Sequence, residues 1–202
     1  MRRGDELRKL MPDDSRVSAL RVTDEVGCVK TNRSIKIGTI GLLLGIAASS
    51  YGFSWPLVNA KIRHDFPNVK RITTRELAGW MNDPQRAAPL LLDVRTRAEY
   101  EVSHLQNGRR VEPDAVASIV TAPKDQPIVT YCSVGYRSGG FAEKLRAAGY
   151  TNVANLEGSI FRWANENRPV YRDDQQVQTV HPYDRIWGSL LQKKYRAKVP
   201  AG

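Results

Sequence analysis

Short apolar runs alternate with helix-like segments between residues 69 and 165, and this alternation constrains the fold more than any other feature of the chain. The strand candidates are residues 69–72, 89–94, 110–112, 127–131 and 151–156. The second candidate, PLLLDV, is almost continuously apolar, which is typical of a strand buried on both faces of a parallel sheet. Regular alternation of strands and helices predicts an α/β layer fold with a mostly parallel sheet.

Helix signals fall between these strands. The helix candidates are residues 74–81, 97–102, 114–120, 138–148 and 159–165. Thr73–Glu76 (TTRE) matches a capping box, in which a hydroxyl and a carboxylate bond the free amides of a helix N-terminus. In the fourth candidate, Phe141, Leu145 and Ala148 share one apolar stripe. Gly149 follows it as the expected left-handed stop.

The N-terminal part of the chain differs in composition from the rest. Residues 1–36 are polar and mixed in charge, so we expect little stable structure there. Residues 37–60 contain no charged side chain and are numerous enough for a membrane-spanning helix. Three interpretations of this segment stay open: a cleaved signal peptide, a transmembrane anchor, and a buried helix of a soluble protein. The first two predict a protein that is exported, either membrane-anchored or periplasmic, with its N-terminal segment meeting the membrane.

Two further segments complete the predicted organisation. Residues 61–170 hold the α/β domain, and residues 171–202 form a C-terminal extension. An amphipathic turn begins at Asp184, and its apolar side chains are Ile186, Trp187, Leu190 and Leu191. We expect this turn to pack on the domain, and a helix that binds a partner protein is the alternative.

Composition excludes several classes of protein. Hydrophobic residues make up 41% and charged residues 26% of the chain, which excludes a wholly disordered protein. Two cysteines are too few for a disulfide-stapled scaffold. The net charge is +10 at pH 7, but Lys and Arg are spread along the chain, so we expect no nucleic-acid partner. The three histidines are scattered without ligand spacing, so we expect no metal site.

The loop after the strand candidate 127–131 carries the chemistry. The strand delivers Cys132 to its carboxyl end, where open α/β sheets place their ligand crevices. The loop amides, the N-terminus of a helix expected from Ser138 and the charge of Arg137 all favour a thiolate over a thiol. Gly135 permits the backbone conformation that a tight ring of amides requires. We therefore expect Cys132 to be a nucleophile with a lowered pKa.

This loop and several flanking motifs resemble the rhodanese family of sulfurtransferases. Residues 132–138 (CSVGYRS) are similar to the active loop of that family. Residues 91–95 (LLDVR) with Glu99–Tyr100 resemble its first motif, and Ser103–Leu105 resembles its Gly-His-Ile segment. The closing pattern of the family is matched by Gly149, Tyr150, Val153, Leu156, Gly158 and Trp163. The resemblance covers about residues 72–170. There are two departures, Gln106–Gly108 in place of the usual Pro-Gly-Ala and Ser159 in place of a second glycine.

The resemblance implies a rhodanese-like, mostly parallel five-stranded sheet and an enzyme that needs no cofactor. Sulfur would pass from thiosulfate, a polysulfide or a persulfide to a thiophilic acceptor, such as a protein thiol, through a persulfide on Cys132. Cys132 and Arg137 would be the catalytic residues, with Arg137 positioning anionic donors. The residues expected to bind the substrate are Ser133, Val134, Gly135, Tyr136 and Ser138.

Two alternatives to this enzyme stay open. Four residues separate Cys132 from Arg137, whereas related protein phosphatases have five, so the tighter ring favours sulfur over phosphate and leaves phosphatase or arsenate-reductase chemistry as a minor alternative. The other is a non-enzymatic persulfide-sensing or sulfur-carrier docking module of the same fold. The neutral loop side chains argue against a strong preference for thiosulfate.

Four polar residues near the motifs are not expected to be catalytic. Asp93 at a strand end and the nearby Arg95 are expected to form a structural ion pair close to the site. Glu99 and His104 belong to the resembling motifs, but an ionised thiolate needs no general base.

Overall fold

The computed structural model describes residues 54–198. The predicted polar segment 1–36 and residues 37–53 of the predicted hydrophobic segment lie outside this range, so the interpretations of that segment stay open. Among residues 54–198, no helix combines the length and the apolar character that crossing a bilayer requires. The end of the hydrophobic segment lies in helix α2 (Trp55–Asp65), which continues into charged residues. Val58 and Ile62 of α2 are buried in the core of the α/β domain.

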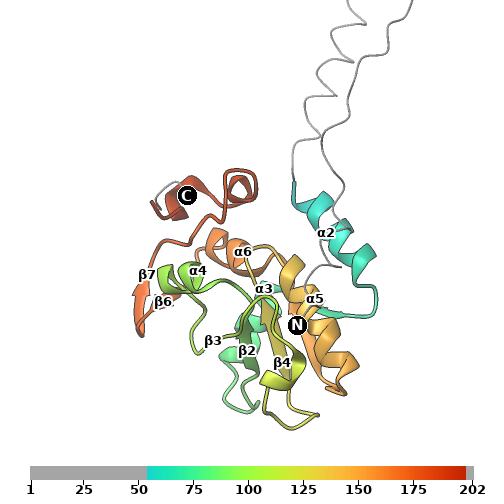
Figure 1. Ribbon diagram of the computed structural model, residues 1–202. Helices are drawn as coiled ribbons and strands as arrows, with labels where there is room; N and C mark the ends of the chain where they lie inside the picture. The colour runs from blue at the N-terminus through green and yellow to red at the C-terminus, as the bar shows by residue number, and fades with distance from the viewer. Residues whose placement is uncertain (1–53, 199–202) are drawn as a thin grey trace, which may run out of the picture. The chain divides into compact units, whose positions relative to one another are not determined.

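The centre of the fold is a five-stranded sheet in which every pair of neighbours is parallel (Figure 1). Its strand order is β1-β5-β4-β2-β3. The strands are β1 (Lys70–Ile72), β2 (Leu90–Asp93), β3 (Arg109–Arg110), β4 (Ile128–Tyr131) and β5 (Val153–Leu156). The predicted α/β fold with a parallel five-stranded sheet is therefore confirmed, and each strand lies within the range expected for it or begins one residue earlier.

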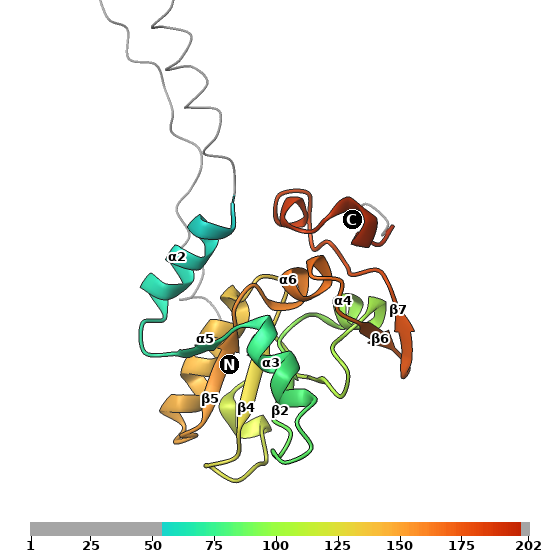
Figure 2. The same cartoon turned by 180° about the vertical axis from the view of Figure 1, so that it is seen from behind.

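Helices cover both faces of the sheet (Figures 1 and 2). On one face, α3 (Thr74–Met81) and α6 (Ser159–Asn165) pack against Leu91 and Val129. On the other face, α5 (Tyr136–Ala147) packs against Leu92 and Ile128. Successive strand side chains point to opposite faces, so the continuously apolar run 89–94 supplies both cores.

Two capping boxes fix where helices begin. Thr73 accepts a hydrogen bond from the Glu76 amide at the start of α3, and Glu76 accepts one from the Thr73 amide, as predicted. Thr96 and Glu99 make the same reciprocal pair at the start of α4 (Arg97–Val102). Each box satisfies amides that a helix end would leave unpaired.

Helix α5 differs from its prediction at both ends. It begins at Tyr136 instead of Ser138, because Gly135 serves as its N-cap with a φ of 111°. Ala148, predicted on the apolar stripe, is exposed, and Ala142 is buried instead. The earlier start places the second half of the cysteine loop in the first turn of the helix.

The helix predicted at 114–120 is wrong. The structure has only a single 3-10 turn there, η2 (Ala117–Ile119). Val116 and Ile119 are 66% and 46% exposed, and Val120 is the one buried side chain of this segment, so it presents no continuous apolar helix face. Their β-branched side chains also disfavour a helix that no tertiary packing supports.

The C-terminal extension packs on the domain, but not as an amphipathic helix. It contains an unpredicted antiparallel hairpin, β6 (Val170–Arg172) and β7 (Gln175–Val177), and the 3-10 turns η3 (Trp187–Leu190) and η4 (Lys193–Tyr195). Leu190 and Leu191 join the same core as α3 and α6, as expected of docking, whereas Ile186 is 65% exposed.

Candidate active site

Cys132 directly follows β4 at the carboxyl edge of the sheet, with 1% of its surface exposed. The start of α6 holds both of its backbone polar groups. The Cys132 amide donates to Ser159 Oγ over 3.1 Å, and the Ile160 amide donates to the Cys132 carbonyl oxygen over 3.2 Å. The Phe161 amide likewise donates to the carbonyl oxygen of Ser133. Helix α6 therefore fixes the backbone that carries the sulfur.

The Cys132 sulfur lies within the turn that opens α5. The Gly135 amide donates to Sγ over 3.1 Å, in a left-handed conformation that glycine adopts without strain. Burial raises the pKa of the Cys132 thiol, but the charge of Arg137 and hydrogen bonds from Ser138 and Gly135 lower it by more. The net pKa therefore lies below the ordinary value of 9.0, which favours the thiolate.

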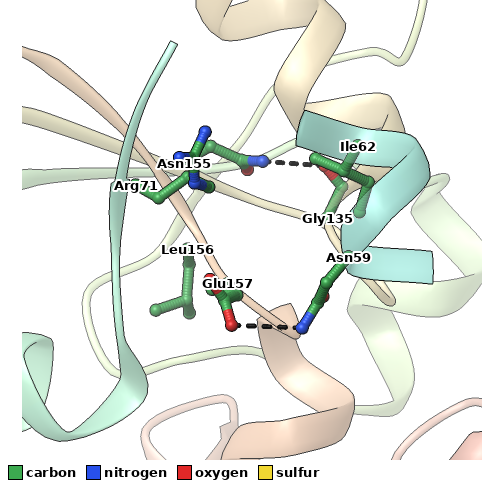
Figure 3. A pocket seen from close by; sticks show the side chains of 7 residues that line it. All are labelled: Asn59, Ile62, Arg71, Gly135, Asn155, Leu156 and Glu157. Atoms are coloured by element: carbon green, nitrogen blue, oxygen red, sulfur yellow. Dashed lines mark hydrogen bonds between the residues drawn. The ribbon is translucent and has the colours of Figure 1, made fainter. Parts of the chain in front are cut away.

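Asn155 of β5 ties the cysteine loop to the sheet (Figure 3). Its Nδ2 donates to the Gly135 carbonyl oxygen over 2.8 Å, and its Oδ1 accepts from the Ser138 hydroxyl over 2.7 Å. A cavity of about 10 Å³, roughly the space of one water molecule, adjoins Asn155, Gly135 and the α2 residues Asn59 and Ile62. Asn155 thus holds the loop residue whose amide faces the sulfur.

Arg137 is bound by a buried carboxylate. Its Nη1 and Nη2 donate to the two carboxylate oxygens of Glu99 over 2.8 and 2.7 Å. The Ser133 hydroxyl donates to Glu99 over 2.8 Å, and Arg137 also donates to Ser133 Oγ over 3.0 Å. The predicted substrate-binding Ser133 and catalytic Arg137 are therefore brought together, but around Glu99. The fork of Arg137 is occupied by this partner, which differs from the expectation that it faces anionic donors.

The Glu99 carboxylate is ionised throughout the neutral range. Burial raises its pKa, but hydrogen bonds and charge from Arg137, the charge of Arg95 and the Ser133 hydroxyl outweigh burial and lower the pKa to about 2. Only 2% of the Glu99 side chain is exposed. Glu99 therefore links the cap of α4 to the cysteine loop, although it is not itself in contact with the sulfur.

Asp93 and Arg95 form the ion pair that the sequence suggested. Arg95 donates through Nε to one carboxylate oxygen of Asp93 over 2.8 Å and through Nη2 to the other over 2.6 Å. Both side chains are fully buried, and Arg95 Nη2 also donates to the Ser103 carbonyl oxygen. The pair therefore braces the segment between β2 and β3.

His104 and His181 take structural positions. The His104 ring stacks on Tyr100 at 4.2 Å between centroids, and its Nδ1 lies 3.0 Å from the Leu105 carbonyl oxygen. His181 Nδ1 accepts from the Tyr183 amide over 3.0 Å. Among residues 54–198, no three His, Cys, Asp or Glu side chains are grouped so that they would hold a metal ion.

A pocket of about 130 Å³ gives access to Cys132. It is lined by Cys132, Ser133, Val134, Tyr136, Arg137, Tyr183 and Trp187. The Tyr183 ring lies over the Arg137 guanidinium, 4.8 Å from ring centroid to Cζ. Two aromatic side chains of the C-terminal extension therefore form part of the wall around the nucleophile.

Comparison with known families agrees with this geometry. Residues 73–166 match the family described as "Rhodanese-like domain". This part of the chain is a rhodanese-like domain. The strands of the five-stranded sheet, the cysteine loop and Glu99 lie within the matched residues or directly beside them, whereas α2, the β6–β7 hairpin, Tyr183 and Trp187 lie outside.

Curated relatives of the rhodanese-like domain are longer proteins. A probable adenylyltransferase/sulfurtransferase MoeZ of Mycobacterium tuberculosis is 30% identical over 101 residues, which are 48% of this chain and 25% of that protein. A tRNA uridine(34) hydroxylase of Escherichia coli is 28% identical over 148 residues, which are 63% of this chain and 41% of that protein. The chain thus spans well under half the length of either relative. Among solved structures, a rhodanese-related protein of Thermoplasma volcanium is 25% identical, with a TM-score of 0.44, over 50% of this chain and 97% of that one.

The two departures from the rhodanese pattern both occur in left-handed backbone. Asn107 has a φ of 59° in the turn that the Gly108 amide closes onto the Leu105 carbonyl oxygen. Ser159 has a φ of 48°. Asparagine adopts the left-handed conformation at lower energetic cost than most residues, whereas serine has no such advantage. The Ser159 hydroxyl accepts a hydrogen bond from the Cys132 amide, so this departure from the family pattern contacts the backbone of the nucleophile.

Sequence reasoning missed most of the supports of this rhodanese-like site. The missed residues are Asn155, Ser159, Tyr183 and Trp187, together with the part that Glu99 plays. Ser159 could have been found from the sequence, because it replaces a glycine of the family pattern and such a replacement indicates that the serine makes a stabilising contact. The other missed residues are far from the loop in sequence and come close to it only when the chain is folded.

Proposed function

We propose that this chain is a sulfurtransferase that carries a sulfane sulfur as a persulfide on Cys132. The observation that best supports it is the Cys132 sulfur itself, which receives the Gly135 amide and has a lowered pKa although it is almost fully buried. A thiol kept as a thiolate in a buried site is suited to nucleophilic attack. The family of the domain and the sulfurtransferase among its relatives point the same way.

The proposed reaction has two displacements. The Cys132 thiolate attacks the outer sulfur of a donor such as thiosulfate, a polysulfide or a persulfide. A new S–S bond forms, the bond to the rest of the donor breaks, and that remainder leaves with the bonding electron pair. The terminal sulfur now carries the negative charge, close to the Gly135 amide. An acceptor thiolate, or cyanide, then attacks the terminal sulfur and releases the Cys132 thiolate, without any cofactor.

Loading of the protein tests the first displacement. The full chain is incubated with a donor, desalted without reductant and weighed intact. We expect a gain of one sulfur atom, which is lost on addition of cyanide. Cys132→Ser abolishes the gain, and the matched variant Cys28→Ser at the other cysteine of the chain retains it. A wild-type protein that gains no sulfur from thiosulfate, polysulfide or persulfide contradicts the proposal.

Turnover separates the enzyme from the sensing or docking module. With excess donor and cyanide, the enzyme forms many equivalents of thiocyanate, whereas a module loads once and stops. Hydrolysis of an aryl phosphate by wild type but not by Cys132→Ser would favour phosphatase chemistry instead. Iodoacetamide reaction against pH reports the thiolate directly, and its midpoint should lie below 9.0.

A further inference from the structure

A second pocket adjoins the pocket of Cys132. It has a volume of about 140 Å³ and is lined by Leu57, Val58, Lys61, Tyr136 and Trp187. Tyr136 and Trp187 line both pockets, so the two cavities share a wall at the mouth of the site. Four of the five lining side chains are apolar or aromatic. All but Tyr136 come from α2 or the C-terminal extension, outside the residues that match the rhodanese-like family.

The cations of both pockets already have carboxylate partners. Arg137 is paired with Glu99, as described above. Lys61 Nζ lies 2.8 Å from Asp65, which also accepts from the Tyr136 hydroxyl over 2.8 Å. Within residues 54–198, the lining of the two pockets therefore offers apolar surface without a cation left over to bind a dianion.

The walls of the second pocket are held in place. Asn59 of α2 donates to Glu157 over 3.1 Å (Figure 3). The Phe66 ring packs on Tyr136 at 5.3 Å between centroids. A Cβ on Gly139 would approach the Phe66 ring to 2.6 Å, so this glycine lets the end of α2 lie against α5. On the opposite wall, the Trp187 amide donates to Asp184 over 2.7 Å.

We propose that the second pocket binds the organic group of the sulfur donor, and that the donor class of this site is a persulfide or thiosulfonate with an aromatic or bulky apolar substituent. This inference rests on the proposed sulfur transfer at Cys132. The donor sulfur would enter the Cys132 pocket while its substituent lies between Leu57, Tyr136 and Trp187. A dianion such as thiosulfate has no apolar group to place in this pocket, and Lys61 and Arg137 of the lining are already paired with carboxylates.

The step balances with a thiosulfonate, R–SO₂–S⁻, as the donor. The Cys132 thiolate attacks its terminal sulfur, the new S–S bond forms, and the bond between the two donor sulfurs breaks. The products are the Cys132 persulfide anion and the sulfinate R–SO₂⁻, which takes the electron pair. No proton or external electron is needed.

Two thiosulfonates that differ only in R test the pocket. The full chain is assayed for thiocyanate formation from cyanide with benzenethiosulfonate and with methanethiosulfonate. We expect wild type to favour the aryl donor by about tenfold or more in kcat/KM, because the ring buries apolar surface that a methyl group lacks. Leu57→Ala should lower the aryl-to-methyl ratio of kcat/KM about fivefold, because the lost apolar contact serves mainly the aryl donor. Benzenesulfinate should also inhibit wild type more strongly than it inhibits Leu57→Ala.

A matched control variant and the use of a ratio between two donors make the result decisive. Leu57 is 51% exposed, and the control Ile119→Ala removes a similarly exposed side chain that lines neither pocket, so it should leave the ratio unchanged. Differences in leaving-group reactivity cancel when the ratio is compared between variants. An unchanged ratio in Leu57→Ala overturns the pocket assignment while sulfur transfer at Cys132 stands. A wild type that transfers sulfur from neither thiosulfonate overturns this inference, and the proposed function falls with it only if thiosulfate, polysulfide and persulfide also load no sulfur onto Cys132.

Discussion

Two carboxylates in this protein each accept hydrogen bonds from a cation and from a hydroxyl group, in very different surroundings. Glu99 accepts from Arg137 and the Ser133 hydroxyl, and Asp65 accepts from Lys61 and the Tyr136 hydroxyl. The bonds are alike, at 2.7 to 2.8 Å. The side chain of Glu99, however, is 2% exposed and that of Asp65 is 21% exposed.

The comparison teaches that burial and the number of bonds, and not the bond lengths, separate the two regions. Water competes for the groups around Asp65 at the pocket mouth but not for those around Glu99 beneath the cysteine loop. Loss of one partner is therefore expected to disrupt the loop and to be tolerated at the mouth. The same division suits the proposed roles, since the loop must hold one sulfur in place while the mouth selects what reaches it.

Glu99→Gln should give the largest loss of stability. It leaves the Arg137 guanidinium without its counter-charge in a mostly buried position, which costs about 3 kcal/mol or more of unfolding free energy. Glutamine can still cap α4, so the loss reports the ion pair. Urea unfolding of the full chain measures it.

The matched control lies in the same helix. Glu101→Gln removes a carboxylate that is 59% exposed and pairs with Arg97 at 3.5 Å, and it should leave the urea midpoint unchanged. Equal midpoints for Glu99→Gln and Glu101→Gln would show that burial does not distinguish these carboxylates.

Acid should remove the contribution of Glu99 in wild type. Its pKa is about 2 in the folded protein against an ordinary 4.5, so its stabilisation is fully present above pH 4.5 and is lost as the pH falls toward 2. Between about pH 5 and about pH 2.5, wild type should lose about 2 kcal/mol more unfolding free energy than Glu99→Gln does. Parallel pH profiles for the two proteins would contradict the lowered pKa.

Substitutions of Ser159 should have a smaller effect on the free energy of unfolding, and the order of stability of two variants can be tested. Ser159→Ala removes the acceptor of the buried Cys132 amide and should cost about 1 to 3 kcal/mol. Ser159→Gly loses the same bond but relieves a left-handed φ of 48°, so it should be about 1 kcal/mol more stable than Ser159→Ala. Urea unfolding of both variants measures the difference. Ser159→Ala as stable as wild type would mean that the hydroxyl does not hold the cysteine backbone.

The parts of the molecule that could be predicted are those encoded locally. The apolar run 89–94 predicted a strand buried on both faces, and Thr73 with Glu76 predicted the start of α3. The cysteine loop could be recognised because residues 132–138 are contiguous. Its helix was placed two residues late, because serine is a favoured N-cap and Gly135 was expected only to permit a tight loop.

The parts that could not be predicted depend on distant residues or unusual turns. Glu99 and Arg137 are 38 positions apart, and no local pattern links them. The β6–β7 hairpin turns through Asp173 and Asp174, both at positive φ, without the Asn-Gly or Asp-Gly pair that marks such turns. The mouth is assembled from α2 and the C-terminal extension, so neither segment alone indicates a pocket.

Asp65→Asn should have the smallest effect of these variants and tests the other half of the comparison. The pKa of Asp65 is lowered by hydrogen bonds from Lys61 and Tyr136, which shows that both prefer the ionised carboxylate. Because the group is solvated, asparagine and water can replace these bonds, and we expect no measurable shift of the urea midpoint. The rate of Cys132 alkylation should change by less than about twofold, since Asp65 does not contact the loop amides. A loss of stability as large as that of Glu99→Gln would mean that the mouth is as rigidly built as the cysteine loop. The preference for an organic donor would then depend on this ion pair as well as on the apolar walls.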